Sequence, residues 1–404
     1  MDWSSVMAER TRHDHRNLVS GSSSSIIQMA GGFPEPELFP ADDWLKATSA
    51  VLQSRGADAL QYNNPAGHEP LRDWISRRVS GSTAINADHI LLTHGAQQGI
   101  DLVAKLLIDP GDRIIVEQPS FHGALWVFQA AGATIVPVPI EKQGIDLNVL
   151  EERLRESEKL RMLPKFIYTI PTFHNPTGYT ATLERRIALL ELAERYGVPV
   201  IEDVPYNELW YDAPPPPTLF ELSNGDSVIQ LGTFSKTLCP SIRVGWIVGA
   251  KEFIRKAVHF KHIADTCSNQ LMQLISYEWC VSGLLDQNIG KARDIYRIKR
   301  DALSKTFLNA QIPGIECTAP GGGFFAWLRL PKGISGTVIQ EAALRHGVAI
   351  AASPMFDAEG KADDACRLTF SYPSEIDITR GVAQLTEAIE SYIHNNKEGI
   401  HNER

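Results

Sequence analysis

Lys236 is the residue of this sequence best placed to do chemistry, because four other reactive residues lie at defined spacings from it. Arg243 follows it by seven residues, and Asn175, Asp203 and Tyr206 precede it. A lysine amine can form a Schiff base, a carboxylate can keep a ring nitrogen protonated, and an amide and a phenol can donate to a ring oxygen. These are the groups that a pyridoxal phosphate (PLP) site requires, with an arginine left for the phosphate.

Each of these residues has a structural interpretation when it is taken alone. Lys236 can be a solvated lysine beside a turn rich in Ser and Thr, and Asp203 can cap a helix or a turn. Tyr206 can be a core aromatic, and Asn175 can be a turn residue. The combination favours the site, since Lys236 follows a buried strand and lies near Arg243. Burial and a nearby cation both lower a lysine pKa and favour the neutral amine.

A loop between a strand and a helix is the candidate for binding the phosphate. Residues 90–92 are apolar and 93–98 follow them, so the amides of Gly95, Ala96 and Gln97 face an anion at the start of the helix. Taken alone, this segment favours an ordinary tight turn. Three further residues would complete the phosphate site, two with hydroxyls and one with a guanidinium that binds two oxygens at once: Thr233, Ser235 and Arg243.

Two further side chains have both a functional and a structural interpretation. Phe121 follows the strand predicted over 113–117, and it either stacks on the cofactor ring or packs in the core. Arg367 lies on an apolar strand between Cys366 and Leu368. It is either an exposed edge residue or drawn inward to bind the α-carboxylate of a substrate.

The composition is that of an ordinary enzyme rather than of a nucleic-acid or membrane protein. The 404 residues are 43% hydrophobic and 22% charged, with a net charge of −9. We therefore expect no nucleic-acid partner and no membrane partner. The five cysteines have neither pairing nor metal spacing, which predicts reduced thiols and no metal. Without a signal-peptide core or a long apolar run, the sequence predicts a cytoplasmic protein.

Apolar runs alternate with helical patterns through the first three quarters of the chain. This alternation predicts an α/β fold with a mostly parallel central sheet covered on both faces. Asp203, Asn175 and Lys236 each follow a strand, where ligands of such sheets bind. A helix is predicted over 183–196. The predicted strands are 90–93, 113–117, 134–138, 165–169, 198–202, 227–231 and 244–248.

The chain changes character after about residue 285, where a basic helical segment and then shorter elements follow. We therefore predict three parts. Residues 1–40 form an N-terminal arm that contributes to the small domain. Residues 41–288 form the large cofactor-binding domain, and residues 289–404 form a small α+β domain.

The motifs resemble those of fold type I PLP enzymes of the class I/II aminotransferase family, over residues 25–385. Asn175 precedes Asp203 by 28 residues, Tyr206 follows by 3 and Lys236 by a further 30, as in that family. The resemblance implies an enzyme of amino-acid metabolism and biosynthesis. It would transfer an amino group from an L-amino acid to a 2-oxo acid through a Schiff base on Lys236.

Residues 31–34 resemble the branch that acts on 2-aminoadipate, kynurenine and aromatic amino acids. In that branch Tyr62 reaches the phosphate of the partner subunit, which implies a homodimer. Gly32 and Asn175 would lie near the substrate, with Arg367 on its carboxylate. Ala96 departs from the family pattern, because a serine hydroxyl often contacts the phosphate there.

Two other functions remain open from the sequence. The same fold and electron sink serve a decarboxylase, a lyase or a specialised biosynthetic synthase, and only the substrate pocket decides between them. A DNA-binding regulator with an aminotransferase-like domain would need a winged helix-turn-helix before that domain. About 30 residues precede Gly31, and they contain no basic recognition helix.

Overall fold

The computed structural model describes residues 1, 3–12 and 25–402, and its largest sheet has eight strands. They are β2 (Ile90–Thr93), β3 (Arg113–Gln118), β4 (Thr134–Glu141), β5 (Gly144–Ile145), β6 (Ile167–Thr169), β7 (Val200–Asp203), β8 (Val228–Thr233) and β9 (Gly245–Val248). Their order is β2-β9-β8-β7-β6-β3-β4-β5. Strands β4, β3, β6, β7 and β8 are parallel, whereas β9 runs antiparallel to β8 and β2. The predicted mostly parallel α/β fold is confirmed.

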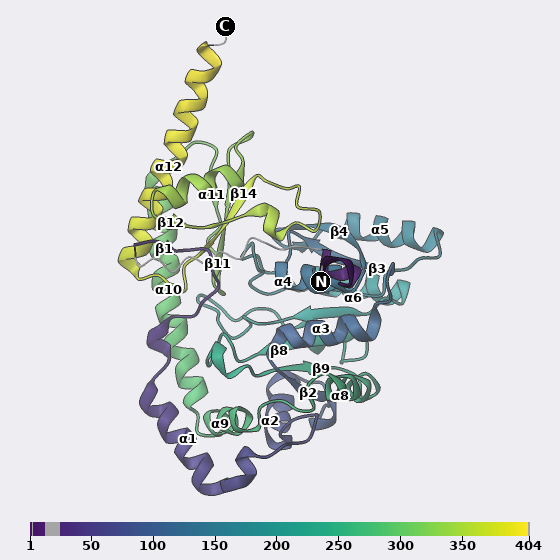
Figure 1. Ribbon diagram of the computed structural model, residues 1–404. Coiled ribbons are helices and arrows are strands. Elements are labelled where there is room, and N and C mark those ends of the chain that lie inside the picture. The colour runs from purple at the N-terminus through teal and green to yellow at the C-terminus, as the bar shows by residue number, and fades with distance from the viewer. Residues whose placement is uncertain (2, 13–24, 403–404) are drawn as a thin grey trace.

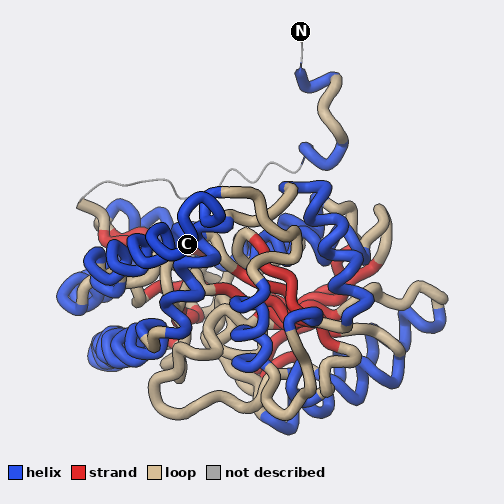
Figure 2. The backbone as a smooth tube through the Cα atoms, turned by 90° about the horizontal axis from the view of Figure 1, so that it is seen from below, coloured by secondary structure: helices blue, strands red, loops and turns tan. Residues whose placement is uncertain are grey.

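Helices cover both faces of this sheet, and Figure 2 shows its strands gathered between them. Successive residues of β8 alternate, with Val228 in the core on one face and Ile229 in the core on the other. The helices on the Ile229 face are α3 (Ala96–Leu107), α4 (His122–Ala130) and α8 (Lys251–Asp265). Those on the Val228 face are α1 (Ala41–Arg55), α2 (Glu69–Val79), α5 (Leu147–Lys159), α6 (Leu183–Tyr196), α7 (Leu219–Leu222) and α9 (Gln270–Val281).

A second group of elements packs beside the large sheet around its own apolar core (Figure 1). Its four-stranded antiparallel sheet has the order β10-β11-β14-β13, and β1 pairs with β12. These strands are β1 (Ile27–Gln28), β10 (Glu316–Cys317), β11 (Phe325–Arg329), β12 (Val348–Ala349), β13 (Ala351–Ala352) and β14 (Ala365–Thr369). The helices are α10 (Leu284–Ala310), α11 (Gly336–Arg345) and α12 (Glu375–Asn402).

One long helix joins the two cores. Near its start, Leu285 and Ile289 of α10 pack in the core under the large sheet, whereas Tyr296 and Leu303 pack in the second core. The division predicted at residue 288 therefore falls inside α10. Of the predicted arm, β1 pairs with β12 in the second group of elements, and residues 13–24 lie outside the described residues.

Across residues 1, 3–12 and 25–402, no helix is both long and apolar enough to cross a membrane. The same residues contain no group of His, Cys, Asp or Glu side chains placed to hold a metal ion. The five cysteines are free thiols.

Candidate active site

Lys236 lies three residues beyond the end of β8, and its amine points toward the N-terminal segment. Its Nζ donates a hydrogen bond of 2.8 Å to the carbonyl of Gly32 and lies 5.4 Å from the ring centre of Phe324. Burial of the amine, helped by the charges of Arg367 and Arg243, lowers the pKa of Lys236 to about 8. The amine is therefore neutral in a larger fraction of molecules at neutral pH than a solvated lysine would be.

Asp203 is the last residue of β7 and is 3% exposed. Its Oδ2 accepts a 2.7 Å hydrogen bond from the hydroxyl of Tyr168 on β6. Its Oδ1 is buried and has no hydrogen-bond partner among the residues that the structure describes. Burial, opposed by the Tyr168 hydrogen bond, raises the pKa of Asp203 to about 6. A cationic N–H donor at Oδ1 would satisfy that oxygen and stabilise the carboxylate.

Arg367 lies on β14, between β11 and β13, and is 4% exposed. Its guanidinium donates to Asn175 Oδ1 at 2.9 Å and to the carbonyl of Ala30 at 2.5 Å. Phe325 and Phe356 flank it, with ring centres 4.2 and 4.6 Å from its Cζ. Burial lowers the pKa of Arg367 to about 10. The exposed-edge interpretation of this arginine is wrong.

The surroundings of Arg367 contain no balancing charge. Within the described part of the chain no carboxylate forms an ion pair with it, and its Nε is buried without a hydrogen-bond partner. A buried guanidinium of this kind favours an anionic ligand, because an unpaired charge away from water is costly. Tyr206, 2% exposed, has its pKa raised by burial.

The phosphate-binding candidates lie where α3 begins. Gly95 is the N-cap of α3, with a φ of 78°, and its position offers the first backbone amides of the helix to an anion. The positive φ of Gly95 favours glycine, and a Cβ there would lie 2.5 Å from Arg243 Nη2, so the guanidinium packs closely against this residue. Arg243 also donates to the carbonyl of His94 at 3.1 Å and to Ser235 Oγ at 3.4 Å.

The hydroxyls after β8 form the other side of this candidate phosphate site. The site as a whole, made of the amides of residues 95–97 with Thr233, Ser235 and Arg243, is called the phosphate cradle below. Thr233 Oγ1 donates to Ser235 Oγ at 2.9 Å and accepts from the Ser235 amide at 3.0 Å. Gln97 Nε2 donates to the carbonyl of Gly123 at 2.8 Å, which ties the cradle to the start of α4, where Phe121 is the N-cap. The structure thus brings together every predicted phosphate ligand of a single chain.

Tyr62, predicted to complete the phosphate site of a partner chain, lies at the surface. It is 81% exposed, on the loop between α1 and α2. Ala96 can offer an anion only its backbone amide, because its side chain has no hydroxyl.

Several contributors were not predicted from the sequence. In the sequence, Tyr168 looks like any other residue of a buried apolar strand, yet its hydroxyl donates a hydrogen bond to Asp203. The carbonyls of Ala30 and Gly32, which accept from Arg367 and Lys236, have no sequence signature. Phe356 lies in a 3-10 turn far from the other motifs, and only the tertiary fold places it on Arg367.

The residues fit pyridoxal phosphate at both of its ends. The unpartnered Asp203 Oδ1 is an acceptor for a protonated ring nitrogen, and the glycine-lined start of α3 beside Arg243 is an anion site. Lys236 lies between these ends on the loop after β8, with an amine of lowered pKa. Fold and site together define a PLP enzyme of fold type I.

The chain belongs to the aminotransferase class I and II family, whose model matches residues 27–385. It is 38% identical to aromatic-amino-acid aminotransferase 1 of Thermococcus litoralis over 371 residues, which are 91% of this chain and 88% of that protein.

Two solved structures share this fold along nearly their whole length. One is the kynurenine aminotransferase of Pyrococcus horikoshii in complex with PMP (TM-score 0.93, 33% identity, 97% of this chain and 98% of that chain). The other is the α-aminoadipate aminotransferase of Thermus thermophilus in complex with N-(5'-phosphopyridoxyl)-L-leucine (TM-score 0.91, 32% identity, 98% and 100%). The protein is an aminotransferase, and its cofactor is pyridoxal phosphate.

Proposed function

We propose that Lys236, Asp203 and Tyr206 are the catalytic residues of this aminotransferase, which moves an amino group from an L-amino acid to a 2-oxo acid. The observation that most strongly supports this proposal is that Lys236 and Asp203 lie at the ends of adjacent strands. One offers an amine of lowered pKa, and the other offers a buried carboxylate oxygen without a partner.

When bound, PLP supplies an electron sink for the electron pair released at the α-carbon of the amino acid. Lys236 Nζ holds the cofactor and then acts as the general base that takes the α-proton, a role suited to an amine with a pKa of about 8. Asp203, held by Tyr168, keeps a proton on the ring nitrogen. The Tyr206 hydroxyl stays protonated, because burial raises its pKa, and it would donate a hydrogen bond to the ring oxygen.

Arg367 binds the α-carboxylate of the substrate, with Gly32 and Asn175 beside it. The buried guanidinium has an aromatic ring on two sides and a free Nε, so a carboxylate can dock there without competition from water. Asn175 Oδ1 accepts from Arg367, which leaves the Asn175 amide nitrogen to donate to the ring oxygen. The same residue thereby couples substrate binding to the cofactor.

The phosphate is bound by Arg243, Thr233, Ser235 and the amides of residues 95–97, with Phe121 on the ring face. The protein acts as a homodimer, and Tyr62 of one chain completes the phosphate site of its partner. Its 81% exposure within one chain supports this arrangement, since an exposed aromatic residue is suited to an interface. Sedimentation at working concentration tests it, and a monomer would contradict it.

Residues 41–288 form the cofactor-binding domain of this enzyme and residues 289–404 the small domain. Of the predicted arm (residues 1–40), β1 is the part that joins the small domain. The two apolar cores and the β1–β12 pairing support that division. A cytoplasmic location is supported by five free thiols, because disulfides are rare in reducing compartments.

Absorbance spectra of the purified protein with each common amino acid in turn test the function directly. A donor converts the bound cofactor to its amine form and releases a stoichiometric 2-oxo acid. Aromatic amino acids, kynurenine and 2-aminoadipate are the first to test, because the relatives above carry those names. Release of carbon dioxide, or of a fragment of the side chain, without the amine form would contradict transamination.

A further inference from the structure

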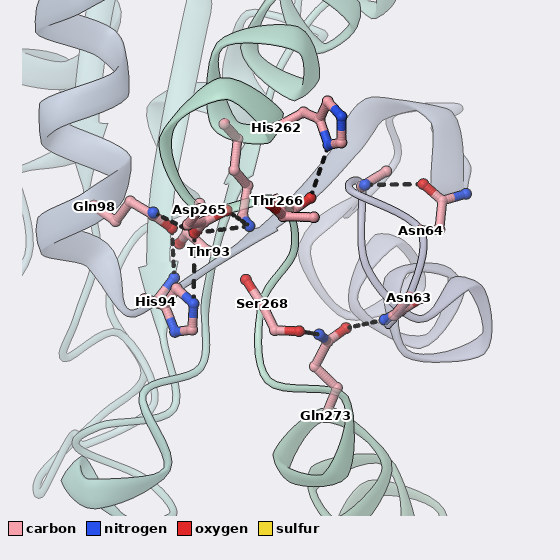
Figure 3. Close-up of polar contacts among 12 residues, drawn as sticks. Asn63, Asn64, Thr93, His94, Gln98, His262, Asp265, Thr266, Ser268 and Gln273 are labelled. Atoms are coloured by element: carbon pink, nitrogen blue, oxygen red, sulfur yellow. Dashed lines mark hydrogen bonds and ion pairs between the residues drawn. The ribbon is translucent and has the colours of Figure 1, made fainter. Parts of the chain in front are cut away.

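A charge network centred on the buried Lys261 lies next to the phosphate cradle, and the reaction described above makes no use of it. Lys261, on α8, is fully buried, and its Nζ donates to both carboxylate oxygens of Asp265, at 2.8 and 3.1 Å. Asp265 Oδ2 in turn accepts from Gln98 Nε2 at 2.7 Å and lies 3.4 Å from His94 Nε2. Figure 3 shows Asp265 facing His94 and Gln98, which come from the loop before α3 and from its first turn.

The network reaches the cradle through His94. The amide of His94 donates to Gln98 Oε1 at 2.8 Å, and its carbonyl accepts from Arg243 Nη2 at 3.1 Å. The next residue is Gly95, the N-cap of α3. His94 is therefore held at its amide, its carbonyl and its ring, between the buried pair on α8 and the guanidinium that faces the phosphate.

The stability of α8 does not explain the Lys261–Asp265 pair. Asp265 is the last residue of α8, where a carboxylate meets the negative end of the helix dipole. The order of lysine before aspartate at i and i+4 is also the less favourable orientation on a helix. A lysine with no exposed surface carries a large desolvation cost. Outside α8, the side-chain hydrogen bond and ion pair that the structure describes for this pair reach Gln98 in the first turn of α3 and His94 in the loop before it.

We infer that Lys261 and Asp265 are positioning residues for the cofactor phosphate. They fix His94 and Gln98, and through them the first amides of α3 and the guanidinium of Arg243. This inference rests on the proposed phosphate site and extends it to residues that do not touch the cofactor. The inference predicts that substitutions in the network weaken binding of the cofactor phosphate and leave binding of the cofactor ring unchanged.

The test compares the dissociation constants of PLP and of pyridoxal, which lacks the phosphate, together with the melting temperature of the apoprotein. Lys261→Met and Gln98→Met should each weaken PLP binding about tenfold, the effect of one lost charge-assisted hydrogen bond. Binding of pyridoxal should stay within about twofold. Gln98→Met leaves the buried pair intact, so it keeps the test valid if Lys261→Met fails to fold.

Two further variants separate positioning from plain stability. The double variant Lys261→Met/Asp265→Leu removes the buried charge of Lys261 together with its partly exposed partner, and replacing an ion pair of this kind by apolar residues is often neutral for stability. It should regain the melting temperature of the apoprotein while PLP binding stays weak. Lys105→Met is the matched control, because Lys105 also pairs with an aspartate four residues away, on the exposed side of α3.

Equal losses of PLP and pyridoxal would overturn the inference, as would a double variant that binds PLP as tightly as the unaltered protein. An unaltered protein that binds neither ligand specifically would overturn the proposed phosphate site as well. Lys105→Met should change none of the three measurements.

Discussion

The ring end and the phosphate end of the site are built by different means. At the ring end, Asp203, Tyr206 and Arg367 are each less than 5% exposed, and burial shifts the pKa of all three. At the phosphate end, the donors are backbone amides at a helix start and the exposed guanidinium of Arg243. Single buried atoms decide the chemistry at one end, whereas several partly solvated donors share the binding at the other. Substitutions at the ring end should therefore have the larger effects.

The largest effect is expected for Lys236→Ala, which should abolish turnover, because no other amine lies at the end of β8 to hold the cofactor or take the proton. Steady-state rates of the purified variant measure this. Lys251→Ala removes a surface lysine paired with Asp88 and should leave the rate unchanged. Native activity in Lys236→Ala would refute the assignment of the site.

Asp203→Asn should slow the first half-reaction by about 10²-fold or more, because the neutral amide no longer keeps the ring nitrogen protonated. Single-turnover absorbance changes report that step separately from product release. Tyr168→Phe should slow the same step by less, since it removes only the hydrogen bond that holds Asp203. If Asp203→Asn reacted at a near-native rate, Asp203 would be a structural residue.

Arg367→Ala should raise the Michaelis constant of the amino acid at least tenfold and leave the PLP dissociation constant nearly unchanged. A charged pair in a buried site contributes about 2–5 kcal/mol when one partner is removed. Steady-state kinetics and cofactor titration of the same preparation give both values. A rise in the PLP dissociation constant alone would place Arg367 at the cofactor instead of the substrate.

The smallest effect is expected at the phosphate end, where Tyr62→Phe should weaken PLP retention by about 1 kcal/mol, the contribution of one hydrogen bond. Mixing Lys236→Ala chains with a more disruptive variant such as Tyr62→Ala should restore some activity, because one hybrid site regains both residues. The absence of any rescue in exchanged dimers would show that Tyr62 acts within its own chain or not at all.

The large sheet was predictable because most of its strands are apolar runs buried on both faces, as in β2, β7, β8 and β9. All seven strands predicted from 90–93 to 244–248 are present, and the helix predicted over 183–196 has the same bounds in α6. The reversed direction of β9 was not predictable, since an apolar run reads the same in either direction. Strands of two residues, such as β1 and β12, are too short to leave a periodic pattern.

The site was predictable where its chemistry depends on residue type and local spacing, as for Lys236, Asp203 and Arg243. It was not predictable where a backbone carbonyl or a distant ring contributes. The acceptor on Gly32 and the ring of Phe356 reach the site only through pairing of the N-terminal segment and the small sheet. Lys261 and Asp265 have ordinary helical spacing, and only their burial against α3 distinguishes them from a surface pair.

Borohydride reduction of the holoenzyme, followed by peptide mapping, tests the central claim most directly. Reduction fixes the cofactor covalently to the lysine that holds it. The account predicts one modified peptide, with the pyridoxyl group on Lys236 and none on the buried Lys261. A pyridoxyl group on another lysine, or no covalent modification of the protein, would contradict the proposed active site.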